Sequence, residues 1–243
     1  MLKSSNIHII SSALLKASKI IRRDFNEIEK LQNSKIGTEK FVNSSLKSIK
    51  ELLYFDLSKA RPEWKIIFIN DEFEANIEEN LIYFVVNCVS GIKNYSKGIS
   101  YFASSIAVMS KGDILTSVIY DPVKDDLFYS EKGKGAFMNN SRIRVSSNKD
   151  ISKTLLVVQK KELIEKIINN KDNLEDIRIL GSDCLDLANT ASGKIDCLCL
   201  DDLNNIKHSA GLLLVRESGG IIYEKNDQNF HTIGNSTLIE KFK

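Results

Sequence analysis

The hydrophobic pattern of the chain changes abruptly within residues 81–103. An uninterrupted apolar run at residues 82–86 gives way to a polar stretch at residues 87–94, and apolar residues return after Gly98. A continuous apolar run that ends in a Ser-Gly turn is typical of a buried strand that delivers a loop to the edge of a sheet, where loops commonly carry chemistry. Taken alone, this stretch is explained more simply as a hairpin connection.

Helical periodicity dominates the region before this strand. Apolar residues recur every three or four positions in residues 6–33 and again in residues 43–55, which predicts two amphipathic helices. A two-residue Gly112-Asp113 turn predicts a hairpin. We expect three further strands in the first half of the chain. One precedes the buried strand, at residues 64–70, and two follow it, at residues 101–109 and 114–120.

Shorter elements alternate in the remainder of the chain. A helix is expected to begin at Ser182 and another near Asn205. The other predicted elements are strands at residues 154–158, 177–180 and 221–223, and a helix at residues 162–168. This alternation of strands and helices predicts a mixed fold.

Charge and composition exclude several classes of protein. The 34 basic and 32 acidic residues leave a net charge of +2, without the basic block of a nucleic-acid-binding domain. No stretch reaches about 18 uninterrupted apolar residues, and the N-terminus does not resemble a signal peptide, so we expect no membrane span. The four cysteines fit neither a zinc pattern nor a disulfide framework, which favours small buried side chains in a reducing cytoplasm. A reactive thiol at Cys88, near Lys93, is the weaker alternative.

Four motifs together resemble those of a known family. Residues 84–95 keep a strand followed by Gly91 and Asn94-Tyr95, and the longest match is at residues 120–146. Two further matches are residues 181–196 and residues 205–220, the second ending in Glu217-Ser218-Gly219-Gly220. The combination resembles the inositol monophosphatase family of Mg²⁺-dependent sugar phosphatases, in its SuhB-like branch. The resemblance covers residues 6–243.

The resemblance implies an α+β / α/β fold, the layered αβαβα sandwich of that family. It implies an N-terminal α+β lobe at residues 1–147 and a C-terminal α/β lobe at residues 148–243, in one compact unit with a cleft between the lobes. It also implies a homodimer, which the apolar content of residues 101–120 favours.

At the metal site of the family, the resemblance predicts a loss of ligands. Of the four principal acidic positions, only Asp71 keeps a carboxylate; the others read Asn87, Ser90 and Lys207. Mg²⁺ prefers hard oxygen ligands, usually including carboxylates, so we predict no bound metal or other cofactor although the family uses Mg²⁺. We expect a vestigial metal and phosphate pocket that consists of Asp71, Glu72, Asn87, Val89, Ser90, Gly91, Ile92 and Lys207.

Two of these positions have further implications. Ile92 stands where the family has a threonine that helps to position the attacking water, just as Leu46 stands where it has an aspartate; the leucine is expected simply to pack. Asp71 and Glu72 follow a predicted strand, and two adjacent acids there equally fit the start of a helix.

On the substrate side of the family's site, the matching residues are Gly181, Ser182, Asp183 and Leu200. Ser182 could help to bind an anion at a helix N-terminus or could only cap the helix. Leu200 stands where the family has a glutamate that contacts substrate hydroxyl groups.

Lys207 has two possible placements. It either lies in the cleft and pairs with Asp71 or Glu72 in place of a metal, or it extends into solvent as most lysines do. His208 follows it on the predicted helix and is expected to point elsewhere. No substitute nucleophile is evident.

Three functions fit this sequence. The first is a catalytically inactive homologue that binds a protein partner or regulates, as the resemblance to the SuhB type implies. The second is a phosphomonoesterase with a metal site rebuilt around Asp71, Glu72 and Asp183. The third is a protein that binds a sugar phosphate without hydrolysis, through Lys207 and Lys93. A fold-level analogy cannot choose among them.

Overall fold

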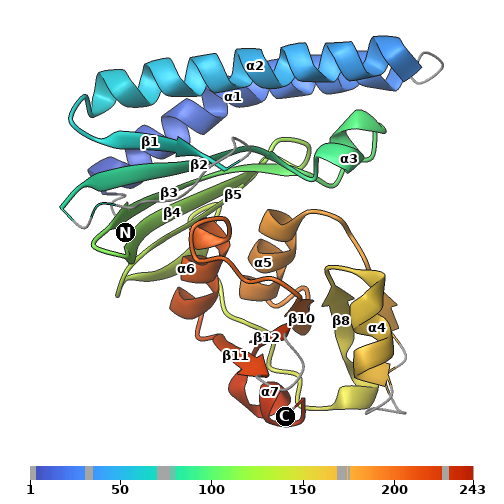
Figure 1. Ribbon diagram of the computed structural model, residues 1–243. Helices are drawn as coiled ribbons and strands as arrows, with labels where there is room; N and C mark the ends of the chain where they lie inside the picture. Colours follow the sequence, from blue (N-terminus) through green and yellow to red (C-terminus); the bar gives the residue numbers. More distant parts are fainter. Residues whose placement is uncertain are drawn as a thin grey trace.

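The computed structural model describes residues 4–30, 35–69, 78, 80–168, 174, 176–225 and 230–242. Its elements form five layers, as Figure 1 shows. The helical layers are the pair α1 (Ser5–Lys30) and α2 (Lys35–Ala60), the pair α5 (Asp183–Ala191) and α6 (Ser209–Glu217), and the outer helices α4 (Lys161–Ile168) and α7 (Ser236–Glu240). One β-sheet lies between the first two helical layers and a second lies between the last two (Figure 1). The predicted αβαβα sandwich is therefore confirmed.

Each sheet is built from one continuous part of the chain. The first has the order β1-β2-β3-β4-β5-β6-β7, antiparallel except for the parallel pair β1 and β2. Its strands are Lys65–Phe68, Ile82–Ser90, Ala103–Ser110, Asp113–Asp121, Asp126–Glu131, Gly135–Met138 and Ser141–Arg142. The second has the order β11-β12-β10-β8-β9. In chain order its strands β8 to β12 are Leu155–Val158, Asp176–Arg178, Cys197–Leu200, Ile221–Lys225 and Phe230–Gly234. The remaining elements are the short helix α3 (Ile92–Ser96) and a 3₁₀ turn at Ile151–Lys153.

Strand β2 is apolar from Ile82 to Val86 because helices cover both of its faces. Phe84 and Val86 lie in the core formed with α1 and α2, whereas Tyr83 and Val85 lie in the core formed with α5 and α6. Alternate residues of a strand point to opposite faces of the sheet, so a strand between two helical layers has no solvent face. Strands β3 and β4 are buried in the same way. The apolar content of residues 101–120 is therefore explained within one chain and no longer argues for a dimer.

In the second sheet, alternation also explains the paired cysteines. Leu198 and Leu200 pack toward α5 and α6, and Cys197 and Cys199 pack on the opposite face toward α4 and α7. All four cysteines of the chain are buried and free of disulfides, as small apolar side chains would be. Cys88 is buried in the core beneath α1 and α2, which favours the packing role over a reactive thiol.

Several predicted boundaries were wrong, and three of them lie between residues 35 and 121. Helix α2 begins eight residues before the predicted residue 43, because Thr38 and Val42 already bury their side chains. Strand β2 does not end at residue 86 but continues to Ser90, since its last residues still pair with β3. The hairpin between β3 and β4 turns on Lys111 and Gly112, both with positive φ, which is the backbone of a two-residue hairpin turn.

The glycines Gly133 and Gly135 join the first sheet to helix α6. Glu217 on α6 accepts hydrogen bonds from the backbone N–H groups of Gly133 and Gly135, each at 2.7 Å. Both glycines have positive φ, and a Cβ on Gly135 would lie 3.0 Å from the Arg142 guanidinium. These two glycines thus shape the turn between β5 and β6. Among the described helices, none combines the length and apolarity that crossing a membrane would need.

Candidate functional site

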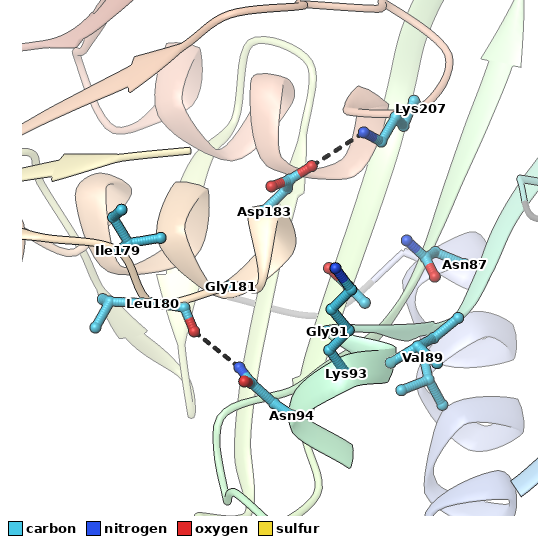
Figure 2. Close-up of a pocket in the computed structure, with 12 residues that line it drawn as sticks. Asn87, Val89, Gly91, Lys93, Asn94, Ile179, Leu180, Gly181, Asp183 and Lys207 are labelled. Carbon is cyan, nitrogen blue, oxygen red and sulfur yellow. Dashed lines mark hydrogen bonds and ion pairs between the residues drawn. The ribbon is translucent and has the colours of Figure 1, made fainter. Parts of the chain in front are cut away.

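A cavity of about 430 Å³ opens where β2 ends, α5 begins and the turn before α6 approaches (Figure 2). We call it the pocket. Its lining consists of Asn87, Val89, Ser90, Gly91, Ile92, Lys93, Asn94, Ile179, Leu180, Gly181, Asp183 and Lys207. Eight of the residues predicted for the metal, phosphate and substrate sides thus lie around one cavity. Asp71 and Glu72 lie outside the described residues.

An irregularity in β2 directs the end of this strand into the pocket. The pairing with β3 shifts in register between Asn87 and Ser90, which is a β-bulge. Bulges re-aim side chains and often lie beside functional sites. Gly91 follows with a φ of 90°, and a Cβ there would lie 3.0 Å from the carbonyl oxygen of Tyr101 and 3.1 Å from Cβ of Ser182. The connection from β2 to α3 can approach the start of α5 this closely only because residue 91 is glycine.

Ser90 has a structural role at this approach. Its hydroxyl oxygen accepts the backbone N–H of Cys184, in the first turn of α5, at 3.2 Å. The hydroxyl of Ser182 donates to the carbonyl oxygen of Ser90 at 3.0 Å and lies 3.2 Å from its hydroxyl oxygen. Ser182 occupies the N-cap position but does not cap α5 through its own side chain. Ser90 thus satisfies one of the backbone N–H groups that the first turn of α5 leaves free.

Asn94 fixes the other side of the same loop. Its side-chain nitrogen donates to the carbonyl oxygens of Tyr101 and Leu180, both at 2.8 Å. The bond to Leu180 joins α3 to the segment before α5, as Figure 2 shows. A Cβ on Gly181 would lie 3.2 Å from the same nitrogen, so this glycine, with a φ of 84°, leaves room for the bond. The pocket walls are thus held by hydrogen bonds that do not need a ligand.

Asp183 is the centre of the charged network. Its Oδ2 atom lies 3.1 Å from the amide nitrogen of Gln159, 3.2 Å from Nζ of Lys207 and 3.2 Å from Nε2 of His208. Burial raises the pKa of Asp183, but the hydrogen bond from His208 and the charge of Lys207 outweigh burial and lower the pKa to about 2. Asp183 is therefore an ionised carboxylate whose Oδ2 atom is already engaged by three donors.

Lys207 and His208 precede α6 rather than lie within it. The predicted start near Asn205 was wrong, since α6 begins at Ser209. The side chain of Asn204 accepts the backbone N–H groups of Ile206 and Lys207, each at 2.9 Å, and so closes a turn. In this turn both Lys207 and His208 reach Asp183. The expectation that His208 points elsewhere was wrong, because it assumed helical geometry.

The placement of Lys207 falls between the two predicted alternatives. Its ammonium lies in the pocket but its side chain is 43% exposed, and its partner within the described part of the chain is Asp183 (Figure 2). Because solvent screens a pair this exposed, the ion pair of Lys207 with Asp183 contributes only ~0–1 kcal/mol to stability.

Asn87 is an unusual member of the lining. It is 7% exposed, and its Oδ1 atom has no hydrogen-bond partner in the described part of the chain. The nearest polar contact of the amide is from Nδ2 to Sγ of Cys184, at 3.9 Å. An unsatisfied buried polar atom costs ~1–3 kcal/mol, so Asn87 is better suited to a ligand or water than to a packed core.

The remaining predicted residues lie in the packed interior. Leu200 is fully buried in β10 beneath α5 and α6 and does not line the pocket. Leu46 packs against the core below α1, as expected of an apolar side chain. Sequence reasoning missed Gln159, Ile179 and Leu180 as members of the site. Only the fold brings Gln159 beside α5, whereas Ile179 and Leu180 directly precede the motif at residues 181–196 without being part of it.

The described donors do not fit a Mg²⁺ site. Mg²⁺ needs octahedral oxygen ligation, usually with carboxylates. Asp183 is the only carboxylate among the described lining residues, and its Oδ2 atom is shared with Lys207. Within the described ranges, no group of three or more His, Cys, Asp or Glu side chains is placed to hold a metal ion. The ammonium of Lys207 would repel a dication in the pocket.

Comparison with known proteins identifies the fold class and then the family. A crystal structure of extragenic suppressor protein suhB from Bartonella henselae superposes with a TM-score of 0.85 and 30% identity, covering 98% of both chains. The chain thus has the α+β layered fold of that structure. The model of the inositol monophosphatase family matches residues 3–241, and the chain belongs to this family.

Named relatives carry two different descriptions. An inositol-1-monophosphatase from Mesorhizobium japonicum is 32% identical, covering 91% of this chain and 86% of the relative. Nus factor SuhB from Escherichia coli K12 is 30% identical, covering 94% of this chain and 89% of the relative.

Proposed function

We propose that this chain is a member of the inositol monophosphatase family that has lost metal-dependent phosphomonoester hydrolysis and acts as a binding or regulatory homologue. One observation carries the proposal: the only carboxylate among the described lining residues, Asp183, is paired with Lys207 at 3.2 Å. Asn87 and Ser90, at two family ligand positions, are neutral, and Ser90 is engaged with α5. In the described pocket a dication would therefore meet one negative charge, on Asp183, which is already paired with the positive charge of Lys207.

The relatives support both a regulatory and an enzymatic alternative. The Escherichia coli relative is named a Nus factor, which favours a regulatory role exercised through a protein partner. The Mesorhizobium relative is named an inositol-1-monophosphatase, which favours the enzyme. The donor set supports the regulatory alternative, because Asp183 is the only carboxylate in the described lining and is already paired with Lys207, whereas hydrolysis needs a metal ion that activates water.

We predict that the purified protein shows no Mg²⁺-dependent hydrolysis of myo-inositol 1-phosphate. The reason is the missing ligand charge, so added Mg²⁺ or Mn²⁺ should give no turnover above that in EDTA. The measurement is phosphate release, with the Mesorhizobium relative assayed in parallel as a positive control. Turnover that EDTA removes and that Asp71→Ala abolishes would establish a rebuilt site and overturn the proposal.

We also propose a cytoplasmic homodimer. Free, buried cysteines fit a reducing compartment. Support for the dimer now comes from family membership alone, because β3 and β4 use their apolar residues within the chain. A solution mass near twice 27.4 kDa is expected by light scattering, and a mass near 27.4 kDa would contradict the dimer.

A further inference from the structure

The pocket has the size and shape of a ligand site. Its volume, about 430 Å³, lies within the range of ~300–1,000 Å³ that is usual for small-molecule sites. Its walls are held without a ligand by the bonds of Asn94, Ser90 and Ser182. Because its walls are already ordered, such a cavity can bind a molecule without the entropic cost of ordering them.

The charge of the pocket favours an anion. Its described lining contains two cations, Lys93 and Lys207, and one anion, Asp183. Figure 2 shows Lys93 and Lys207 approaching the same space from α3 and from the turn before α6. An ammonium group has three N–H donors, and the pair with Asp183 uses one of those on Lys207. Donors that remain on both lysines can bind an anionic group directly, in charge-assisted hydrogen bonds.

Asn87 gives an independent indication of a ligand. It lies across the pocket from Asp183 (Figure 2), is more than nine-tenths buried, and has an Oδ1 atom without a partner among the described residues. Buried polar atoms are nearly always hydrogen-bonded. Because an amide can present either its oxygen or its nitrogen, Asn87 can complete its bonding with a donor or an acceptor of the ligand.

The rest of the lining is apolar and does not suit a polyhydroxylated ligand. Val89 and Ile92 line one wall, and Ile179 and Leu180 line another. Ile179 is 48% exposed at the pocket, although a large apolar side chain is usually buried. The polar side chains of Asn94 and Ser90 are already engaged. Sugar hydroxyl groups against these walls would lose water without gaining partners.

We propose that the pocket binds a small organic anion with an apolar body, held without metal by Lys207 and Lys93 and packed against Ile179. The proposal rests on the proposed function, because Lys207 can hold the anion only where no metal ion takes that place. It goes beyond that function by naming the chemistry of the ligand, an anion whose body is apolar rather than a sugar.

The test is calorimetric titration of the intact protein in EDTA at low salt, with phenyl phosphate, myo-inositol 1-phosphate and inorganic phosphate as probes. Phenyl phosphate should bind saturably and at least about tenfold more tightly than the other two, because only its ring can cover Ile179 and Leu180. No saturable binding of phenyl phosphate, or equal or tighter binding of myo-inositol 1-phosphate, would overturn the inference.

Variants separate the two halves of the site. Lys207→Gln should weaken the binding of phenyl phosphate at least about tenfold. Lys124 is exposed and does not line the pocket, so Lys124→Gln should leave the affinity for phenyl phosphate unchanged. Ile179→Ser should remove the advantage of phenyl phosphate over inorganic phosphate. Loss of binding with Lys124→Gln, or retention of the full advantage with Ile179→Ser, would contradict the proposed placement of the ligand.

The same preparations distinguish this inference from the proposed function. Release of phosphate with Mg²⁺ would refute the proposed function whatever the titration in EDTA shows. Absence of both hydrolysis and binding would leave the proposed function standing and refute the anion pocket alone.

Discussion

The combined substitution Asn87→Asp, Ser90→Asp, Ile92→Thr and Lys207→Asp should create a Mg²⁺ site in the pocket. It removes one positive charge and adds three negative charges around one cavity. Near a protein surface a pair of unit charges about 4 Å apart interacts by ~4 kcal/mol, and a dication doubles each interaction. Solvent screening reduces the interaction energy at the half-exposed position 207. We therefore expect the affinity for Mg²⁺ to increase at least about a thousandfold. Isothermal titration measures it directly.

A matched variant isolates the part played by Lys207. The triple substitution Asn87→Asp, Ser90→Asp and Ile92→Thr adds two carboxylates but leaves the ammonium of Lys207 in place to neutralise one of them. We expect this variant to bind Mg²⁺ weakly, and Lys207→Asp alone to bind none, since positions 87 and 90 then stay neutral. If the triple variant binds Mg²⁺ as tightly as the variant with all four substitutions, Lys207 does not occupy the place of a metal.

Thermal unfolding gives a second readout of the same change. Without Mg²⁺, the new carboxylates lie close to Asp183 and to one another, so the variant with all four substitutions should unfold at a lower temperature than the natural protein. A ligand that binds only the folded state stabilises it, so Mg²⁺ should raise the unfolding temperature of this variant and not that of the natural protein.

The second large effect is a change in how stability depends on pH in Asp186→Asn. Asp186 lies one turn after Asp183 on α5, is 1% exposed, and accepts the hydroxyl of Tyr101 at 2.7 Å. Burial raises the pKa of Asp186, the hydrogen bond from Tyr101 lowers it, and the charge of Asp183 raises it; the result is a pKa of about 7. The folded state therefore holds a proton that the unfolded chain releases near pH 4.

The sign of the effect follows from this difference. The folded protein binds more protons than the unfolded chain between about pH 4 and pH 7, so the contribution of Asp186 to stability falls as pH rises through that range. An asparagine has no carboxylate to charge. The stability of Asp186→Asn relative to the natural protein should therefore increase from pH 4.5 to pH 8, by on the order of a few kcal/mol. Urea unfolding at several pH values measures it.

Tyr101→Phe is the matched control. It removes the donor that lowers the pKa of Asp186, so it should deepen the loss of stability toward high pH. Asp183 contributes in the opposite sense: its pKa is lowered to about 2, so its stabilisation is lost only as pH falls below about 4. A constant difference between Asp186→Asn and the natural protein from pH 4.5 to pH 8 would contradict the raised pKa.

Periodicity and motifs were sufficient to predict the layers of the fold. The apolar run of β2 predicted a strand buried on both faces, and Cys197 and Cys199 share a face as their spacing requires. The boundaries were less predictable, because they depend on tertiary pairing. Ser90 belongs to a strand only because β3 lies beside it, and no local pattern shows this.

For the pocket, the sequence predicted members but not partners. The resemblance placed Asn87, Ser90 and Lys207 around one cavity, although it could not show that Asp183 would be the described partner of Lys207. That pairing depends on the Asn204 turn, which sets both Lys207 and His208 before α6 begins. Gln159 could not have been found, since it is far from the motifs in sequence and reaches the site only at the end of β8. Ile179 directly precedes the motif at residues 181–196, but no local pattern shows that its side chain stays exposed at the pocket.

The central claim is that the pocket carries no competent metal site, and a titration of the natural protein with Mn²⁺, followed by the EPR signal of the free ion, tests it most directly. We predict no saturable binding at micromolar concentrations, and Lys207→Gln should bind Mn²⁺ no better because Asn87 and Ser90 still lack charge. Stoichiometric binding of Mn²⁺ that Asp71→Ala removes would show that the chain has rebuilt a metal site, which would contradict the claim.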